Sequence, residues 1–176
     1  MLPPDTLTGL LEEVKSVAAV RPDAEVTIEA NPGTVDAAAL AQLLAAGFNR
    51  LSLGAQSGHD RFLKTIGRTH TVAQVEAVMA TARSAGFNNI SLDLIYGLPG
   101  ETLDSWRQTL EWAMALQPDH LSCYGLQVEE GTPLAKMVRE GKIRLPGEDE
   151  VSAMFLENTK VLPAAGYQQY EISNFA

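Results

Sequence analysis

The sequence has a single cysteine, Cys123, among 176 residues. One cysteine excludes an intramolecular disulfide and any zinc or iron–sulfur site built from several cysteines of the same chain. Basic residues are also scarce, since 13 Lys and Arg face 22 Asp and Glu and give a net charge of -9. A nucleic-acid surface needs clustered Lys and Arg that displace counterions, so we expect no nucleic-acid partner.

Long apolar runs are missing as well. No stretch approaches the ~20 apolar residues of a membrane-spanning helix. Pro3, Pro4 and Asp5 come too early for the apolar core of a signal peptide. We therefore expect no transmembrane segment and a cytoplasmic location. Hydrophobic content of 45% and charged content of 20% are typical of a globular chain, and the length suits one domain with a real core.

One phrase recurs along the chain. Ala46–Leu53 reads AGFNRLSL, Ala85–Leu92 reads AGFNNISL, and Ala165–Ile172 is a looser copy. Each copy follows an Ala-rich helical pattern, and its glycine is suited to end a helix in the left-handed conformation before a strand begins. The first two copies are separated by about 40 residues, a period that predicts repeated strand–helix units and a parallel sheet.

Hydrophobic periodicity predicts four strands and five long helices. The strands are expected at Glu25–Glu29, Arg50–Leu53, Ile90–Tyr96 and His120–Leu126, and the helices at Leu7–Ala19, Asp36–Ala46, Val72–Ala85, Leu103–Leu116 and Glu148–Ala165. Units of this spacing form either a doubly wound sheet or a (β/α) barrel. The stretch Glu129–Gly147, rich in Gly, Pro and charge, is expected to leave the regular repeat.

Four polar residues lie where parallel α/β folds bind ligands, near the carboxyl ends of the strands. Glu29 ends the first strand and suits a ligand amine or ribose hydroxyl, while Gln56 ends the second and suits amide recognition. Arg68 suits a carboxylate, which a guanidinium holds with two parallel bonds. Asp93 lies in an apolar run, where an unpartnered acid is costly, so we expect a ligand or Arg68 beside it. Glu29, Gln56 and Arg68 also have structural readings, as a strand end, a backbone partner and a solvated charge.

Other chemically active residues favour structural readings. His59, His70 and His120 are too scattered for a metal site and are expected to be polar loop or capping residues. Cys123 is expected to be a small buried hydrophobe. The turn Gly97–Gly100 allows close approach of a flat ligand or simply joins strand to helix, and it matches neither a P-loop nor a dinucleotide fingerprint.

Several segments together resemble the oxygen-independent coproporphyrinogen III oxidase family of radical S-adenosylmethionine (SAM) proteins. They are Glu29–Thr34, Arg50–Ser57, Leu63–His70, Asp93–Gly100 and Tyr170–Ala176, and they occur in order over most of the chain. The ending YEISNFA, with His120–Tyr124 and Glu129–Pro133, resembles the HemW branch, whose members are regarded as haem chaperones.

The resemblance implies an α/β fold, a partial (β/α) radical-SAM barrel with parallel strands and outer helices. The family binds a [4Fe–4S] cluster through a C-x3-C-x2-C loop, with SAM on the open iron, and Glu29, Gln56, Arg68 and Asp93 match its SAM-contacting positions. That cysteine loop is absent here. Residues 1–176 are therefore expected to be the central part of the barrel domain, without the cluster-binding units and the C-terminal domain, and to lack radical catalysis alone.

Several functions remain open at this point. The resemblance implies a haem chaperone, with haem or porphyrin and a haem-acceptor protein as partners, or an anaerobic coproporphyrinogen III dehydrogenase of porphyrin biosynthesis. A non-catalytic nucleoside- or porphyrin-binding module and a phosphate-binding α/β enzyme are the alternatives. A barrel without its first strands exposes a sheet edge near Glu25–Glu29, which predicts self-association.

Overall fold

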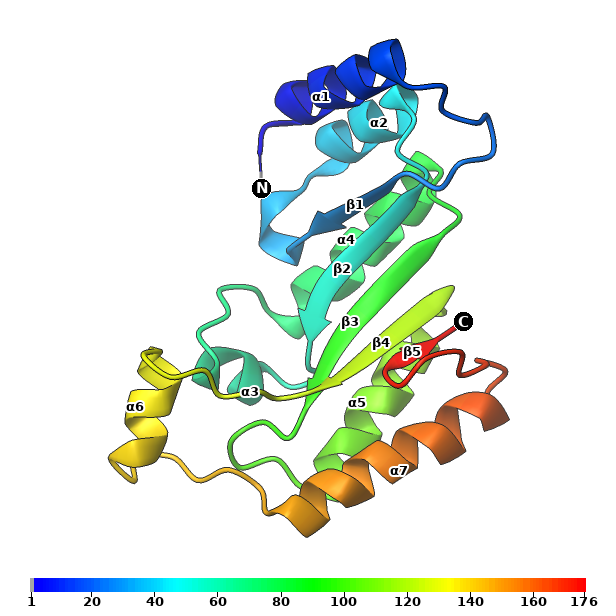
Figure 1. Cartoon of the computed structure of the whole chain (residues 1–176). Coiled ribbons are helices and arrows are strands. Elements are labelled where there is room, and N and C mark those ends of the chain that lie inside the picture. The colour runs from blue at the N-terminus through cyan, green and yellow to red at the C-terminus, as the bar shows by residue number, and fades with distance from the viewer. Residues whose placement is uncertain (1) are drawn as a thin grey trace.

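The computed structural model describes residues 2–176 and shows helices and strands alternating along the chain (Figure 1). In chain order the elements are α1 (Pro4–Val17), β1 (Thr27–Ala30), the 3-10 turn η1 (Pro32–Thr34), α2 (Ala37–Ala46), β2 (Arg50–Gln56), α3 (Asp60–Thr65), α4 (Val72–Ala85), β3 (Ile90–Tyr96), α5 (Leu103–Ala115), β4 (His120–Gly125), α6 (Pro133–Arg139), α7 (Glu148–Ala164) and β5 (Asn174–Phe175).

The strands form one sheet in the order β1-β2-β3-β4-β5. The first four are parallel, each paired with the strand that precedes it, and β5 runs antiparallel to β4. A doubly wound sheet would reverse its strand order at a switch point, whereas a (β/α) barrel adds its strands in sequence. The order therefore decides between the two architectures, and the predicted partial barrel is confirmed.

The repeated phrase has a clear structural role in its first two copies. Gly47 and Gly86 each end a helix with a positive φ, 108° and 109°, which an L side chain adopts only with strain. The aromatic residue that follows, Phe48 or Phe87, is buried in the core. Each phrase thus ends a helix, places one large apolar side chain and enters the next strand.

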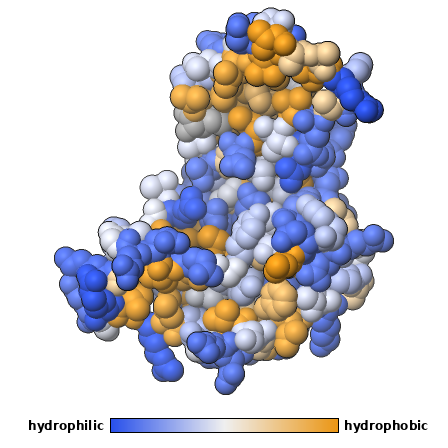
Figure 2. All heavy atoms as spheres, in the orientation of Figure 1, coloured by the Kyte–Doolittle hydropathy of each residue, from blue (hydrophilic) through white to orange (hydrophobic). Residues whose placement is uncertain are grey.

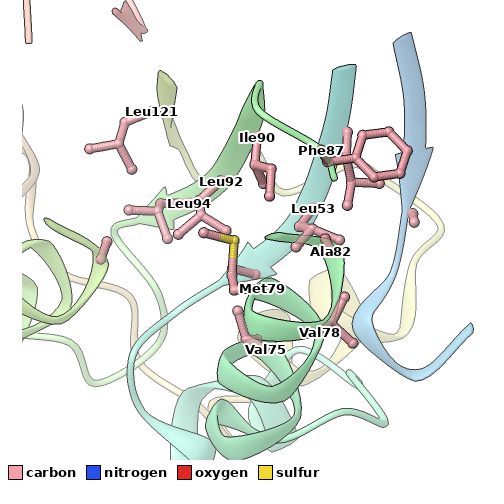
Figure 3. Packing of buried hydrophobic residues seen from close by; sticks show 14 of the residues in the cluster. Leu53, Val75, Val78, Met79, Ala82, Phe87, Ile90, Leu92, Leu94 and Leu121 are labelled. Carbon is pink, nitrogen blue, oxygen red and sulfur yellow. The ribbon is translucent and has the colours of Figure 1, made fainter. Parts of the chain in front are cut away.

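Alternating residues give the sheet one apolar face. On β2 and β3, Leu51, Leu53, Ile90, Leu92 and Leu94 are fully buried. Figure 3 shows part of this row packed against Val75, Val78 and Met79 of α4, and the same core includes residues of α2, α5 and α7. Burial of each large aliphatic side chain contributes roughly 1.5–3 kcal/mol, so this face holds the helices on the sheet.

The third copy of the phrase and two short helices differ from the predictions. The third copy of the phrase does not lead into a parallel strand, because the chain after Gly166 turns back and Phe175 pairs with Leu121 in an antiparallel strand. The helices α3 and α6 were not predicted, since six and seven residues are too short for a clear periodicity. The predicted excursion at Glu129–Gly147 does leave the repeat, and no residue of α6 is buried.

The first strand forms one edge of the sheet. Within residues 2–176, β1 pairs with β2 alone, so its other side carries free backbone groups, as the sequence predicted.

In the same part of the chain, no helix combines the length and the apolar character needed to cross a membrane.

Candidate functional site

The face of the sheet opposite the helices is polar. The residues that alternate with the buried apolar row on β2, β3 and β4 are mainly hydrophilic: Arg50, Ser52, Gln56, Ser91, Asp93, His120 and Ser122. In Figure 2 hydrophilic residues dominate the middle of the molecule, and hydrophobic ones gather at the end formed by α1 and α2. A sheet whose inner face is polar does not seal itself into a packed core and is suited to hold a polar ligand.

The four residues singled out in the sequence lie around one cavity. Glu29, Gln56, Arg68 and Asp93 all line a hollow of about 300 Å³. They come from β1, β2, the loop after α3 and β3, so distant parts of the chain converge there. Convergence of charged and amide groups from separate elements is typical of a binding site, because a packed core does not require it.

Neighbouring residues hold two of these side chains. Ser52 Oγ donates to Oδ2 of Asp93 at 2.9 Å, and Arg68 Nη1 donates to Oδ1 of Asn31 at 3.1 Å. Arg68 was one of two expected partners for Asp93, but the hydrogen-bond partner of Asp93 is Ser52. The charges of Arg68 and Asp93 therefore remain available to a ligand.

Gln56 has an unusual backbone at the end of β2. Its φ is 69°, in the left-handed region that side chains other than glycine rarely adopt, and the pairing of β2 with β3 is irregular between Leu53 and Gln56. Backbone strain of this kind costs about 1–3 kcal/mol and is concentrated at functional sites. The Gln56 side chain is buried at the cavity, where it is aimed by this irregularity.

Gly54 forms part of the cavity wall. A Cβ atom there would lie 2.7 Å from Gln56 Nε2 and 3.2 Å from Asn31 Oδ1. The absence of a side chain thus keeps open the space between these two polar groups, as expected where a ligand approaches the backbone closely.

A second, larger cavity of about 520 Å³ adjoins the first. It shares Glu29, Ser52, Gln56 and Asp93 with the smaller cavity and continues across β4 to the segment before β5. Its additional lining residues include Arg50, Ile95, His120, Tyr124, Leu126 and Tyr170. The polar face therefore offers space for two adjacent ligands.

His120 is held on both sides of its ring. Its Nδ1 lies 2.8 Å from Ser91 Oγ and its Nε2 lies 2.8 Å from the Tyr170 hydroxyl. Burial, followed by the positive charge of Arg50, lowers the pKa of His120. The imidazole is therefore neutral at pH 7, and its two bonds fix its orientation.

The other histidines and the cysteine have structural roles, as the sequence indicated. His59 Nε2 lies 3.1 Å from the Ser105 carbonyl, and His70 Nε2 lies 3.2 Å from that of Ala55. Within residues 2–176, no three His, Cys, Asp or Glu side chains are arranged to hold a metal ion. Cys123 is 1% exposed, and burial raises the pKa of its thiol, so it is not a reactive thiolate.

The turn after β3 is held by a hydrogen bond within the turn. Leu98 is fully buried, so it offers no apolar surface to a flat ligand. Glu101 accepts a hydrogen bond from the Leu98 amide at 3.1 Å, while its other carboxyl oxygen is buried without a partner among residues 2–176. Burial raises the pKa of Glu101 to about 7. The burial of Leu98 favours the reading in which this turn simply joins β3 to α5.

The sequence reasoning did not assign roles to Asn31, Ser52, Gly54 or Arg50. A signal for Ser52 and Arg50 was present, because polar residues at alternate positions of β2 already indicate a hydrophilic face. No local pattern indicates the bond between Asn31 and Arg68, because the two residues are brought together only by the packing of separate loops.

Comparisons with known proteins show the family of the chain. The profile of the Radical SAM superfamily matches residues 3–113. The chain is 40% identical over 173 residues to "Radical S-adenosyl methionine domain-containing protein 1, mitochondrial" of Mus musculus, covering 98% of this chain and 39% of that protein. It is 38% identical over 173 residues to "Heme chaperone HemW" of Bacillus subtilis (strain 168), covering 98% of this chain and 46% of that protein.

A solved structure shares the fold. Coproporphyrinogen III oxidase (HemN) from Escherichia coli, described as a radical SAM enzyme, superposes with a TM-score of 0.84 at 30% identity. The match covers 99% of this chain and 40% of that one. This chain thus spans less than half the length of each of these relatives.

Proposed function

The chain belongs to the radical SAM superfamily, and on that premise we propose that it binds S-adenosylmethionine in the cavity lined by Glu29, Gln56, Arg68 and Asp93. The observation that carries the proposal is the convergence of these four side chains on a single hollow. Family membership makes SAM the expected cofactor, and the hollow lies on the polar face of the sheet.

The chemistry of the lining residues fits this molecule. SAM carries a carboxylate, an amine, a sulfonium and ribose hydroxyls, and the cavity offers a guanidinium, two carboxylates and an amide. Gly54 leaves a cradle that a Cβ atom would fill. When bound, SAM supplies a sulfonium whose carbon–sulfur bond is open to reductive cleavage, while the protein orients and shields it.

Each residue then has a distinct task. Arg68, steadied by Asn31, binds the carboxylate of the amino-acid part. Asp93, steadied by Ser52, keeps its negative charge for the amine or a ribose hydroxyl. Glu29 and Gln56 complete the set of hydrogen-bond partners at the two neighbouring strand ends.

The residues of this chain do not fit an iron–sulfur cluster. The sequence holds one cysteine, and Cys123 is buried on the apolar side of β4. A cluster of the kind expected in the full-length relatives needs several thiolates. We therefore assign SAM binding to this chain and no reductive cleavage to the chain alone.

For the whole protein we propose a haem chaperone of the HemW type, with haem and a haem-acceptor protein as its partners. Identity to "Heme chaperone HemW" of Bacillus subtilis is 38%, against 30% to the coproporphyrinogen III oxidase, which favours the chaperone over porphyrinogen oxidation. The cytoplasmic location stays a prediction, because the name of the mouse relative places that protein in mitochondria.

Isothermal titration with SAM tests the cofactor site. We expect wild-type chain to bind SAM, and Arg68→Ala and Asp93→Ala each to weaken binding by roughly tenfold or more, the usual effect of losing a charged hydrogen bond. Arg139→Ala, an exposed arginine on α6, is the matched control and should bind as wild type does. Unchanged binding in both site variants would remove the proposed site.

A second titration separates SAM binding from simple nucleoside binding. 5′-Methylthioadenosine carries the nucleoside but no amino acid, so its affinity should not depend on Arg68. If it binds as tightly as SAM and Arg68→Ala weakens neither ligand, the cavity recognises the nucleoside alone, and the role given to Arg68 is wrong.

A further inference from the structure

Arg50 is a half-buried charge that lies outside the proposed SAM site. It is the first residue of β2, on the polar face, and its side chain is 18% exposed. Its Nη1 atom lies 3.4 Å from Thr27 Oγ1 and 3.9 Å from a carboxyl oxygen of Glu25. Among residues 2–176, its Nε and Nη2 atoms have no hydrogen-bond partner. Most of the donor capacity of this guanidinium is therefore unused.

Arg50 lies between two hollows, so its free donors border both of them. Arg50, His120 and Tyr170 line the cavity of about 520 Å³, and all three also line a hollow of about 550 Å³ at the opposite ends of the strands. They thus form a floor between the two hollows, closed on one side by the bond from His120 to Tyr170. Arg50 therefore lies where the larger cavity meets the hollow at the opposite ends of the strands.

The rest of the cavity indicates what kind of ligand fits. Ile95, Tyr124 and Leu126 give its wall an apolar part, while Arg50 gives its floor a positive charge. His120 is neutral, so Arg50 is the cation of this floor. Its nearest acid, Glu25, is 58% exposed and too far away for a strong ion pair. A guanidinium with a free edge binds a carboxylate through two parallel hydrogen bonds.

We propose that Arg50 anchors the carboxylate of a second ligand, whose apolar body lies in the larger cavity beside the SAM pocket. This inference rests on the proposed function in one respect, namely that the second ligand is a porphyrin. The porphyrin expected of a haem chaperone carries propionate carboxylates on a planar apolar ring and so has the required chemistry. Arg50 is then the residue that makes the cavity prefer a free acid over a neutral ligand.

Titration of the full chain with protoporphyrin IX, followed by porphyrin fluorescence, tests the assignment. Wild type should bind the free acid roughly tenfold or more tightly than the neutral dimethyl ester, because only the free acid offers a carboxylate to Arg50. Arg50→Gln should lose that preference and bind both forms as wild type binds the ester. Arg50→Lys, which keeps the charge without the planar fork, should show an intermediate preference.

Two controls make the result specific. Arg139→Gln removes an exposed arginine outside the cavity and should leave the preference intact, and thermal unfolding should show that every variant is folded. SAM titration of the same variants keeps this inference apart from the proposed function. Failure of wild type to bind SAM refutes the SAM site, whereas Arg50→Gln retaining the preference for the free acid refutes the anchor. Absence of porphyrin binding to wild type, or equal loss in Arg139→Gln, would also overturn it.

Discussion

Ser52 on β2 donates a 2.9 Å hydrogen bond to Asp93 on the neighbouring strand β3. A hydroxyl orients a carboxylate without neutralising it, whereas a guanidinium would cancel its charge. Because Arg68 is instead bonded to the amide of Asn31, the opposite charges of Arg68 and Asp93 do not pair with each other. This separation suits a zwitterionic ligand, since the amine and the carboxylate of an amino acid need partners of opposite sign.

The first prediction concerns Gly54. Gly54→Ala should weaken SAM binding by roughly tenfold or more, because the new Cβ would lie 2.7 Å from Gln56 Nε2 and fill the cradle. Gly33→Ala is the matched control, since a Cβ there meets no atom within 4 Å. Isothermal titration gives both affinities. Equal SAM binding by the two variants would show that the ligand does not approach Gly54.

The second prediction concerns Asn31 as a positioning residue. Asn31→Ala removes the 3.1 Å bond to Arg68 and should weaken SAM binding by roughly threefold to tenfold, less than Arg68→Ala does. It should leave the affinity for 5′-methylthioadenosine unchanged, because that ligand lacks the carboxylate that Arg68 binds. Asn88→Ala, at the opposite ends of the strands, serves as control. A loss of affinity for both ligands would indicate a general structural role instead.

The third prediction is a pH dependence of stability through Glu101. Its pKa is raised by burial from an ordinary 4.5 to about 7, so the folded state holds the proton more tightly than the unfolded state. The free energy of unfolding should therefore fall as the pH rises from about 4.5 to about 7, by an amount on the order of 3 kcal/mol. Urea unfolding across this range measures it.

Glu101→Gln provides the control for that prediction. Its side-chain oxygen can still accept from the Leu98 amide, but it cannot ionise. The variant should be more stable than wild type at pH 8 and should lose this part of the pH dependence. If wild type and variant give parallel curves, Glu101 is not the group responsible.

The fourth prediction concerns the free edge of the sheet. The Val26 carbonyl accepts hydrogen bonds from β2, so the alternation of a parallel strand directs the backbone groups of Thr27 to the unpaired side of β1. We expect the isolated chain to self-associate through this edge. Sedimentation at rising protein concentration measures the association. Thr27→Pro, which removes one edge donor, should reduce association.

The apolar outer side of α1 offers a competing explanation for such association. Leu10 is 59% exposed on that helix. Leu10→Glu should therefore leave association unchanged if the strand edge is the interface. A monodisperse monomer for wild type would contradict the prediction altogether.

Much of the fold follows from local signals. Val72–Ala85 is a helix with the bounds that the sequence predicts, because Thr71 caps its start and Gly86 ends it in the left-handed conformation. The helix α6 and the antiparallel β5 could not be predicted in this way. Seven residues, none of them buried, and a strand of two residues give no periodicity, and the position of β5 depends on contact with β4.

The candidate site shows the same contrast between residues that local sequence patterns indicate and contacts that only the folded chain shows. Glu29, Gln56, Arg68 and Asp93 were indicated because polar residues near the ends of apolar strands are unusual, and the structure places them around one cavity. Their partners required the folded chain. The bond of Arg68 to Asn31 joins loops that no pattern in the sequence connects.

The sequential strand order has a consequence for how the chain is assembled. Every parallel strand pairs with the strand made just before it, so no pairing has to wait for a distant segment. The sheet can therefore grow outward from its first strand while synthesis proceeds, and each new strand finds its template already in place. The antiparallel β5 also pairs with the strand that precedes it, β4, although it runs in the opposite direction.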